Sequence, residues 1–450
     1  MSAAPRALVA ALACALLLAA APAGAAAKVQ AVTSPGGIAA WLVEDHSVPV
    51  VTFDVDFRGG AALDPADKAG LASLAAELLD EGAGTLDSQA FQGKLEDLAA
   101  SLDFGVGEDD MDASLRSITA NLAPSLELLH LALTAPRFDE TSVARVKGQL
   151  LDELAREQRR PQHVAGRLWL ENAFGDHPYA RPRQGTPETI ARIGAEDLRA
   201  LVKRRFAKDD MIIGVVGDIT PETLEALLDR SFGDLPAHAA PDDVPETAVR
   251  AKAPLLLARM AIPQSVVTFG QPGIKRDDPD WYAAYVDNHI LGGGGFSSRL
   301  TDEVRVKRGL AYSVYSALDP YRQAGLILGG VATENSRVAQ SIDIIRAEWR
   351  RMREAGPTPE ELQDAKTYLT GSFALGFDST AHIASLLVAV QRDGLGIDYL
   401  DRRNALIDAV TLEDAKRVAH RLFDPDQLSF VVVGAQEQLP GAKEVPPGGE

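Results

Sequence analysis

Residues 195–218 read AEDLRALVKRRFAKDDMIIGVVGD, and residues 412–435 read LEDAKRVAHRLFDPDQLSFVVVGA. Each segment has the pattern of a helix that begins with acidic residues, followed by a turn and an apolar strand. The two segments are 217 residues apart (412 − 195) and share Glu-Asp, Arg-x-Phe and Val-Val-Gly at equivalent positions. A second pair of similar helices begins near Asp139 and Pro359. Two similarities at nearly one period predict a duplicated domain of about 210 residues.

The segments around the repeats predict where the domains begin and end. Residues 237–253 are rich in proline and lack an apolar period, which is typical of an extended linker. Residues 440–450 are rich in Pro and Gly and predict a flexible tail. We therefore expect an N-terminal domain over 28–236, a linker over 237–253, a C-terminal domain over 254–439 and a tail over 440–450.

Within each repeat the order of elements predicts the fold class. Residues 39–45 and 48–57 have the composition of strands, and the second alternates apolar and polar residues from Val51 onward. Such alternation is expected of a sheet with one covered face. Long helical patterns follow, and residues 211–216 predict a closing strand. We expect two α+β domains, each with a sheet covered by helices on one face.

The first 27 residues have the pattern of a secretory signal peptide. Arg6 precedes an apolar run from Ala7 to Ala21, and small residues at 23–27 offer a cleavage site. That run is shorter than the ~20 residues of a membrane span, and no later stretch approaches this length. The only cysteine, Cys14, leaves with the signal, which excludes disulfides and thiolate chemistry from the mature chain. We expect a periplasmic protein without an integral membrane segment after cleavage.

The formal net charge of −19 argues against nucleic acid or an anionic membrane as a partner. It is compatible with a surface or chamber that attracts basic peptides, although solubility alone also explains it. The glycine run at 292–295 is not followed by Gly-Lys-Ser/Thr, so it does not predict a phosphate-binding loop. A hinge or a close approach of two backbones is the better interpretation.

Two further segments carry the functional information. Residues 70–85 read GLASLAAELLDEGAGT, and residues 292–316 read GGGGFSSRLTDEVRVKRGLAYSVYS. Taken alone, the leucines of the first segment recur at helical spacing and are explained by an ordinary buried helix. Together, the segments resemble the M16 metallopeptidases (insulinase/pitrilysin and processing peptidases). There the first helix opens Gly-Leu-Ala-His with an inverted H-x-x-E-H motif, and the second domain carries Ser-Arg-Leu followed by Arg-Gly-Leu-Ala-Tyr-Ser-Val.

The resemblance covers essentially the whole mature chain and implies a fold and a set of site positions. The implied fold has two homologous tandem domains, each an antiparallel-rich sheet covered by helices (M16 peptidase-like/LuxS-metallohydrolase-like). In register, Ser73 and Glu77 stand at the zinc-binding histidines and Ala76 stands at the general-base glutamate. Glu153, 76 residues beyond Glu77, matches the third ligand and is a vestige. Zinc needs about three protein ligands, so we expect no metal on this chain.

The same resemblance assigns an Arg/Tyr pair seven residues apart, here Arg305 and Tyr312. A guanidinium presents a donor fork to a substrate carbonyl, and a phenol can donate to a developing oxyanion. The alternative is an arginine paired with Glu303 or Asp302 and a tyrosine packed at a strand start. His289, directly before the glycine run, is expected in a core or loop role, with an oriented functional histidine as its alternative.

The resemblance implies a non-catalytic subunit of a periplasmic M16-type zinc endopeptidase. Such a subunit closes a peptide chamber with a zinc-bearing partner and donates Arg305 and Tyr312 to the substrate carbonyl in trans. The alternative is a peptide-binding pseudo-enzyme that acts as a scaffold or chaperone. An active hydrolase with an unfamiliar site is the weakest hypothesis, since the mature chain has no cysteine and no G-x-S-x-G motif. Whether Glu77 and Glu153 bind another cation weakly stays open.

Overall fold

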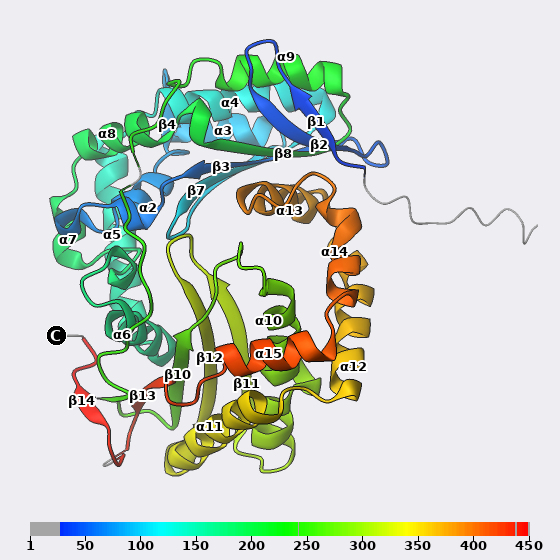
Figure 1. Cartoon of the computed structure of the whole chain (residues 1–450). Helices are drawn as coiled ribbons and strands as arrows, with labels where there is room; N and C mark the ends of the chain where they lie inside the picture. The colour runs from blue at the N-terminus through cyan, green and yellow to red at the C-terminus, as the bar shows by residue number, and fades with distance from the viewer. Residues whose placement is uncertain (1–27, 242, 437–438, 449–450) are drawn as a thin grey trace, which may run out of the picture.

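Two six-stranded sheets, one from each half of the chain, form the body of the protein (Figure 1). The structure, a computed structural model, describes residues 28–241, 243–436 and 439–448. The predicted signal peptide, residues 1–27, lies outside the described residues.

The first sheet is mostly antiparallel, and only β2 and β8 pair in parallel. Its strands lie in the order β1 (Gln30–Thr33), β2 (Ala39–Glu44), β8 (Met211–Gly217), β3 (Val50–Arg58), β7 (Asp110–Ile118) and β6 (Ser101–Val106). A separate two-stranded ribbon consists of β4 (Gly82–Ala83) and β5 (Leu86–Asp87).

The second sheet repeats the order of five of these strands. It contains β14 (Lys443–Val445), β9 (Leu255–Arg259), β13 (Ser429–Gly434), β10 (Gln264–Pro272), β12 (Gly325–Glu334) and β11 (Ala311–Pro320). Only the edge strand β14 differs, because it comes from the C-terminal end and pairs in parallel with β9. The helix–strand pair α8 (Ala195–Arg205) and β8 recurs as α15 (Leu412–Leu422) and β13. The predicted duplication and the predicted α+β class of two homologous domains are therefore confirmed.

Helices cover one face of each sheet. On the first sheet they are α2 (Leu71–Ala76), α3 (Ser88–Asp97), α4 (Leu122–Thr134), α5 (Glu140–Glu157), α7 (Pro187–Arg192), α8 and α9 (Pro221–Phe232). On the second they are α10 (Trp281–Asn288), α11 (Val338–Ala355), α12 (Pro359–Gly371), α14 (Tyr399–Asp408) and α15. Val51, Phe53, Val55 and Phe57 of β3 point into the first helical core and are at most 1% exposed. Burial of such apolar area drives each half to fold around its own core.

One helix from each half packs on the sheet of the other half. Helix α6 (Pro161–Phe174) lies on β10 and β13 of the second sheet, and Trp169 is fully buried there. Helix α13 (Thr380–Arg392) lies on β3 and β8 of the first sheet (Figure 1). The two helices start 219 residues apart (380 − 161), so they are equivalent members of the repeat.

This exchange corrects the expectation that helices cover only one face of each sheet. The polar face of β3 is buried as well, because Thr52, Asp54 and Asp56 lie beneath α13 with exposures of 1%, 7% and 3%. Polar contacts fill that interface: the Thr52 and Thr380 hydroxyls are 2.8 Å apart, and Ser385 donates to the carboxylate of Asp54. The alternation that indicates an exposed face marks here an interface between the two halves.

Ser385→Ala is expected to lower the free energy of unfolding by about 1–3 kcal/mol, because it removes the hydroxyl donor of a buried carboxylate. Chemical denaturation measures the change. Ser101→Ala, at an exposed position on β6, is the matched control and should change stability by less than about 0.5 kcal/mol. Equal effects of the two variants would contradict a role for Ser385 in joining the halves.

The segments outside the sheets are held by backbone hydrogen bonds. Between residues 237 and 253 the described residues form no helix or strand, yet Thr247 donates to Gln323 and Arg250 to Ala173, both at 2.9 Å. The expected flexible tail, 440–450, instead carries β14, which pairs in parallel with β9. Within the described ranges no single helix has the length and composition of a membrane span, whereas Pro359–Gly376 and Thr380–Arg392 meet both criteria only as a bent pair.

Candidate functional site

Helix α2 and its C-cap carry the three positions that the resemblance aligns with the zinc motif, and no histidine stands at any of them. The helix ends at Ala76, and Glu77 is its C-cap, exposed to solvent. The Ser73 hydroxyl donates to the backbone carbonyl of Arg183 at 2.9 Å, and Ala76 is buried among apolar neighbours. The side chains at the three motif positions therefore serve packing, a backbone contact and solvation.

The start of α2 is fixed by a buried carboxylate. Asp64 accepts from the backbone N–H of Gly70 at 2.9 Å and of Ala72 at 3.2 Å, which satisfies donors that a helix start leaves unpaired. Burial raises the pKa of Asp64 to about 7 despite these hydrogen bonds. Gly70 has φ +91°, and a Cβ there would lie 2.6 Å from the Gln184 carbonyl oxygen, so glycine is required.

The remaining candidate ligand lies on a neighbouring helix. Glu153 is on α5, which contacts α2, and has no hydrogen-bond or ion-pair partner among the described residues. In the part of the chain that the structure describes, no group of three His, Cys, Asp or Glu side chains is placed to hold a metal ion. A hydroxyl, a methyl and two separate carboxylates do not fit zinc, which takes three converging protein ligands in catalytic sites.

The glycine run in the second half makes a close backbone approach. A Cβ on Gly292 would lie 2.3 Å from the Ser316 hydroxyl and 2.6 Å from its backbone nitrogen, so the run packs directly on β11. Gly295 has φ +57°, a left-handed conformation that side chains other than glycine rarely adopt. His289, just before the run, is buried and stacks on the ring of Tyr368 at 5.1 Å. Burial lowers the pKa of His289, which fits a packing role.

Arg305 and Tyr312 lie together on the surface of the second half. Arg305 is in the π-helical turn Thr301–Val306, and Tyr312 is near the start of the edge strand β11. The Arg305 guanidinium lies over the Tyr312 ring at 4.8 Å and over the Phe296 ring at 4.7 Å from the ring centroids. Tyr312 is 82% exposed and Phe296 is 76% exposed. We call these three residues the Arg/Tyr platform.

The acidic neighbours of Arg305 are engaged elsewhere. Lys307 contacts Asp302 at 2.8 Å and Glu303 at 2.7 Å, and Arg308 also pairs with Glu303. Hydrogen bonds from Lys307 and Arg308 lower the pKa of Glu303. The alternative pairing of Arg305 with Asp302 or Glu303 is therefore not observed. Among the described residues the Arg305 guanidinium and the Tyr312 hydroxyl have no hydrogen-bond partner, so their donors face solvent.

A buried arginine anchors the platform. Arg299, 6% exposed, donates from Nε to Glu361 at 2.7 Å and from Nη2 to the same carboxylate at 2.6 Å. Nη2 also donates to the Gly356 carbonyl at 2.9 Å. These bonds connect the start of the Thr301–Val306 turn to α12 and to the end of α11. Arg299 and Phe296 lie within the 292–316 motif, but the sequence alone assigns them no role. The ion pair of Arg299 with Glu361 and the contact of Phe296 with Arg305 form only in the folded chain.

The geometry therefore separates the predicted residues into two groups. Arg305 and Tyr312 are brought together in the second half, whereas Ser73, Ala76, Glu77 and Glu153 lie on α2 and α5 of the first half. The platform can donate hydrogen bonds to a carbonyl or an oxyanion, but it supplies no base and no metal-bound water.

Comparisons with known proteins match this description. The first part, residues 40–187, matches the family "Insulinase (Peptidase family M16)", and residues 192–369 match "Peptidase M16 inactive domain". The chain is 29% identical over 396 residues to the "Non-peptidase homolog YmxG" of Helicobacter pylori, covering 88% of this chain and 91% of that protein. It is 26% identical to an uncharacterized zinc protease of Mycobacterium leprae, covering 87% of this chain and 88% of that protein.

A solved structure has the same architecture. The crystal structure of a peptidase M16 inactive domain from Pseudomonas fluorescens aligns with a TM-score of 0.86 at 29% identity. The alignment covers 92% of this chain and all of that one, so the similarity extends over both halves.

Proposed function

The chain belongs to the M16 peptidase family, and we propose that it is the non-catalytic subunit of a zinc endopeptidase of that family. One combination of observations carries the proposal: the positions of the zinc site hold Ser73, Ala76 and Glu77, while an exposed Arg305–Tyr312 pair has donors without partners. A chain that keeps only the donor half of a hydrolytic site fits a role beside a second chain that bears the metal.

In this proposal the subunit closes a peptide chamber with a zinc-bearing M16 partner. Arg305 presents its donor fork to a substrate carbonyl, and Tyr312 donates to the oxyanion that forms when the partner's zinc-activated water attacks. Phe296 and Arg305 stack, which restricts the rotamers of the guanidinium before substrate arrives. The partner supplies the zinc and the base, and this chain supplies orientation and charge stabilisation.

The proposed compartment is the periplasm, with residues 1–27 as a cleaved signal peptide. The mature chain, residues 28–450, then has no cysteine and requires no disulfide in an oxidising compartment.

The second candidate is a peptide-binding pseudo-enzyme that acts as a scaffold or chaperone. The exposed apolar surface at Phe296 and Tyr312 favours it, because such rings bind unfolded peptides without any chemistry. The two candidates differ in one property: only the first requires a zinc-bearing partner.

The test is peptide cleavage with zinc quantified by elemental analysis. The mature chain is assayed alone and after addition of a zinc-motif M16 chain from the same source. We expect no cleavage and far less than one zinc per chain for the protein alone, and cleavage that a zinc chelator abolishes for the mixture. Stoichiometric zinc and cleavage by the chain alone would overturn the proposal. Suppression of peptide aggregation with no cleavage in the mixture would favour the second candidate.

A further inference from the structure

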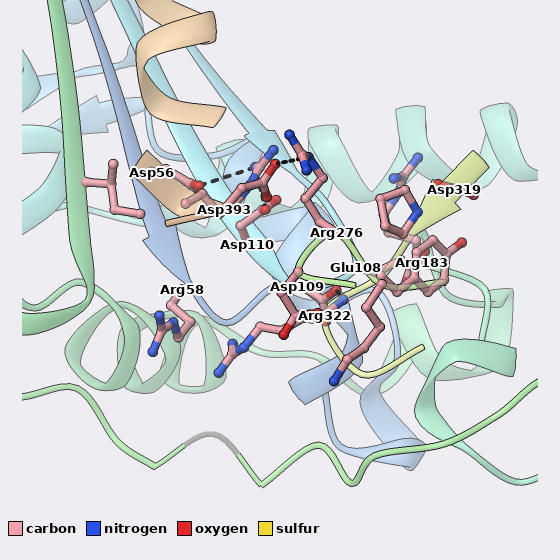
Figure 2. Close-up of a pocket in the computed structure, with 16 residues that line it drawn as sticks. Asp56, Arg58, Glu108, Asp109, Asp110, Arg183, Arg276, Asp319, Arg322 and Asp393 are labelled. Carbon is pink, nitrogen blue, oxygen red and sulfur yellow. Dashed lines mark hydrogen bonds and ion pairs between the residues drawn. The ribbon is translucent and has the colours of Figure 1, made fainter. Parts of the chain in front are cut away.

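A cavity of about 700 Å³ lies between the two halves (Figure 2), and its lining includes no residue of the Arg/Tyr platform. Almost all of its lining side chains are charged. The first half contributes β3, the β6–β7 turn and Arg183, and the second half contributes the segment before α10, the β11–β12 hairpin and the end of α13. The charged lining residues are Asp56, Arg58, Glu108, Asp109, Asp110, Arg183, Lys275, Arg276, Asp277, Asp319, Arg322, Arg392 and Asp393.

One carboxylate in this lining is buried and only half satisfied. Asp56 on β3 is 3% exposed, and its Oδ2 lies 3.3 Å from the Arg392 guanidinium. Its Oδ1 is buried and has no hydrogen-bond partner among the described residues. Arg392 is shared, because it also donates to Asp110 at 2.7 Å. A buried carboxylate oxygen without a donor is costly, so Asp56 carries negative charge that Arg392 only partly compensates when the carboxyl is ionised.

Two further carboxylates at the cavity are unpaired. Glu108 and Asp319 come from different halves, and neither side chain has a hydrogen bond or ion pair to a described residue. Figure 2 shows Glu108 and Arg183 close together, but no contact between them is short enough for an ion pair. The Arg183 side chain also has no hydrogen bond or ion pair to a described residue, so one guanidinium faces two unpaired carboxylates.

Most other cations of the lining are already committed. Arg276 lies 3.5 Å from Asp393 and stacks over the Trp281 ring, and Lys275 donates to Glu246 at 2.9 Å. Asp109 is committed too, since it accepts from the Tyr179 hydroxyl at 2.6 Å and from the backbone N–H of Arg322 at 2.8 Å. The uncompensated groups are therefore mainly acidic.

We propose that this cavity binds an organic cation, through an ammonium or guanidinium group, with Asp56, Glu108 and Asp319 as its anionic partners. A volume of about 700 Å³ suits a small organic ligand. The carboxylates do not converge as a metal site would, because the described residues include no group of three placed to hold a metal ion. Since Asp56 and Glu108 belong to one half and Asp319 to the other, the bound cation joins the halves.

The surroundings of these acids give the binding a pH dependence. Burial raises the pKa of Asp56 to about 7, with Asp110, Asp112 and Asp54 adding to the shift and Arg392 opposing it. Burial also raises the pKa of Glu108 to about 7, where Arg183 opposes the shift and Asp109, Asp319 and Asp64 add to it. A cation pairs with the ionised carboxylates. Binding should therefore strengthen as pH rises from 6 to 8 and should release protons near pH 7.

The experiment is titration calorimetry of the purified mature chain alone, so its outcome does not depend on the proposed peptidase partner. The probes are spermidine, as a free polyamine, and N-acetyl-argininamide, as the basic side chain of a peptide. Each is titrated at pH 6 and pH 8 in two buffers of different ionisation enthalpy, which counts the protons released. Binding of either probe supports the site, and the tighter one identifies the source of the cation.

Variants locate the binding. Asp56→Asn and Glu108→Gln keep the side-chain shape and should each weaken binding about 10- to 100-fold, the loss typical of a charge-assisted hydrogen bond. Asp103→Asn, at an exposed position on β6, is the matched control and should bind as the parent does. Circular dichroism checks that each variant is folded. If Asp56→Asn does not fold, the affinity of Glu108→Gln alone tests the proposal. No binding by the parent, or equal binding by parent and both cavity variants, overturns the proposal.

Discussion

Tyr312→Phe is expected to lower peptide cleavage by the reconstituted pair of subunits about 10²–10³-fold, the usual loss when one oxyanion donor is removed. The phenol is 82% exposed and its hydroxyl has no partner among the described residues, so the substitution removes a donor without disturbing a contact. In the proposed role the phenol donates only in the transition state, so the loss should fall on kcat more than on KM. Initial rates over a range of peptide concentrations measure both.

Tyr315→Phe is the matched control. Tyr315 lies three residues further along β11 and is 56% exposed, but its ring packs against Gly330 rather than Arg305. Its cleavage rate should equal that of the parent. Arg305→Ala should lower the rate and also weaken peptide binding, because in the proposed role the guanidinium contacts the ground-state carbonyl as well. Unchanged cleavage by Tyr312→Phe in an assembled, active mixture would exclude the donor role.

Arg299→Ala is expected to lower the free energy of unfolding by about 3–5 kcal/mol, the cost of removing one partner from a buried ion pair. Arg299 donates twice to Glu361 and once to the Gly356 carbonyl, and its loss leaves Glu361 with only the Thr358 backbone donor. Arg308→Ala, which removes an exposed partner of Glu303, is the control and should cost at most about 1 kcal/mol. Denaturant titration of the three proteins compares them, and similar midpoints would contradict the anchor.

The same pair predicts a pH dependence of stability. Burial alone would raise the pKa of Glu361, but hydrogen bonds from Arg299 and the Thr358 backbone outweigh it and lower the pKa to about 2. An unfolded glutamate titrates near ~4.3, so the stabilisation is complete above that pH and is lost as pH falls from about 4.5 toward 2. The stability difference between the parent and Glu361→Gln should therefore shrink over that range. A constant difference would mean that the carboxylate charge does not stabilise the fold.

Much of the fold could be predicted because it is encoded locally. The acid-capped helix, the turn and the Val-Val-Gly strand are short patterns, and their recurrence at 195–218 and 412–435 shows the duplication without any knowledge of packing. The exchange of α6 and α13 could not be predicted in this way. The polar residues Asp54 and Asp56 have the pattern of an exposed face, and only tertiary structure places α13 over them.

The candidate site also has a part that could be predicted from the sequence and a part that depends on tertiary contacts. The resemblance to the M16 family implied that Arg305 and Tyr312 act as a pair, and the structure places the two side chains in contact. The third member, Phe296, is joined to them by the close approach of the glycine run to Ser316, a contact between distant backbones. The inter-half cavity gave only a weak signal, the run Glu108-Asp109-Asp110, because Asp319 and Arg392 come from segments more than 200 residues further on.

The exchange of α6 and α13 between the two halves has a consequence for ancestry and for protein engineering. A chain that held only one repeat would leave one face of its sheet exposed to solvent. Its α6 or α13 equivalent would have no sheet to pack against. Two copies of such a chain would complete each other by swapping that helix, which describes a two-fold symmetric homodimer. The present molecule has the arrangement that fusion of such a dimer into one polypeptide would give. Cutting it between residues 237 and 253 should yield fragments that are soluble only when co-expressed.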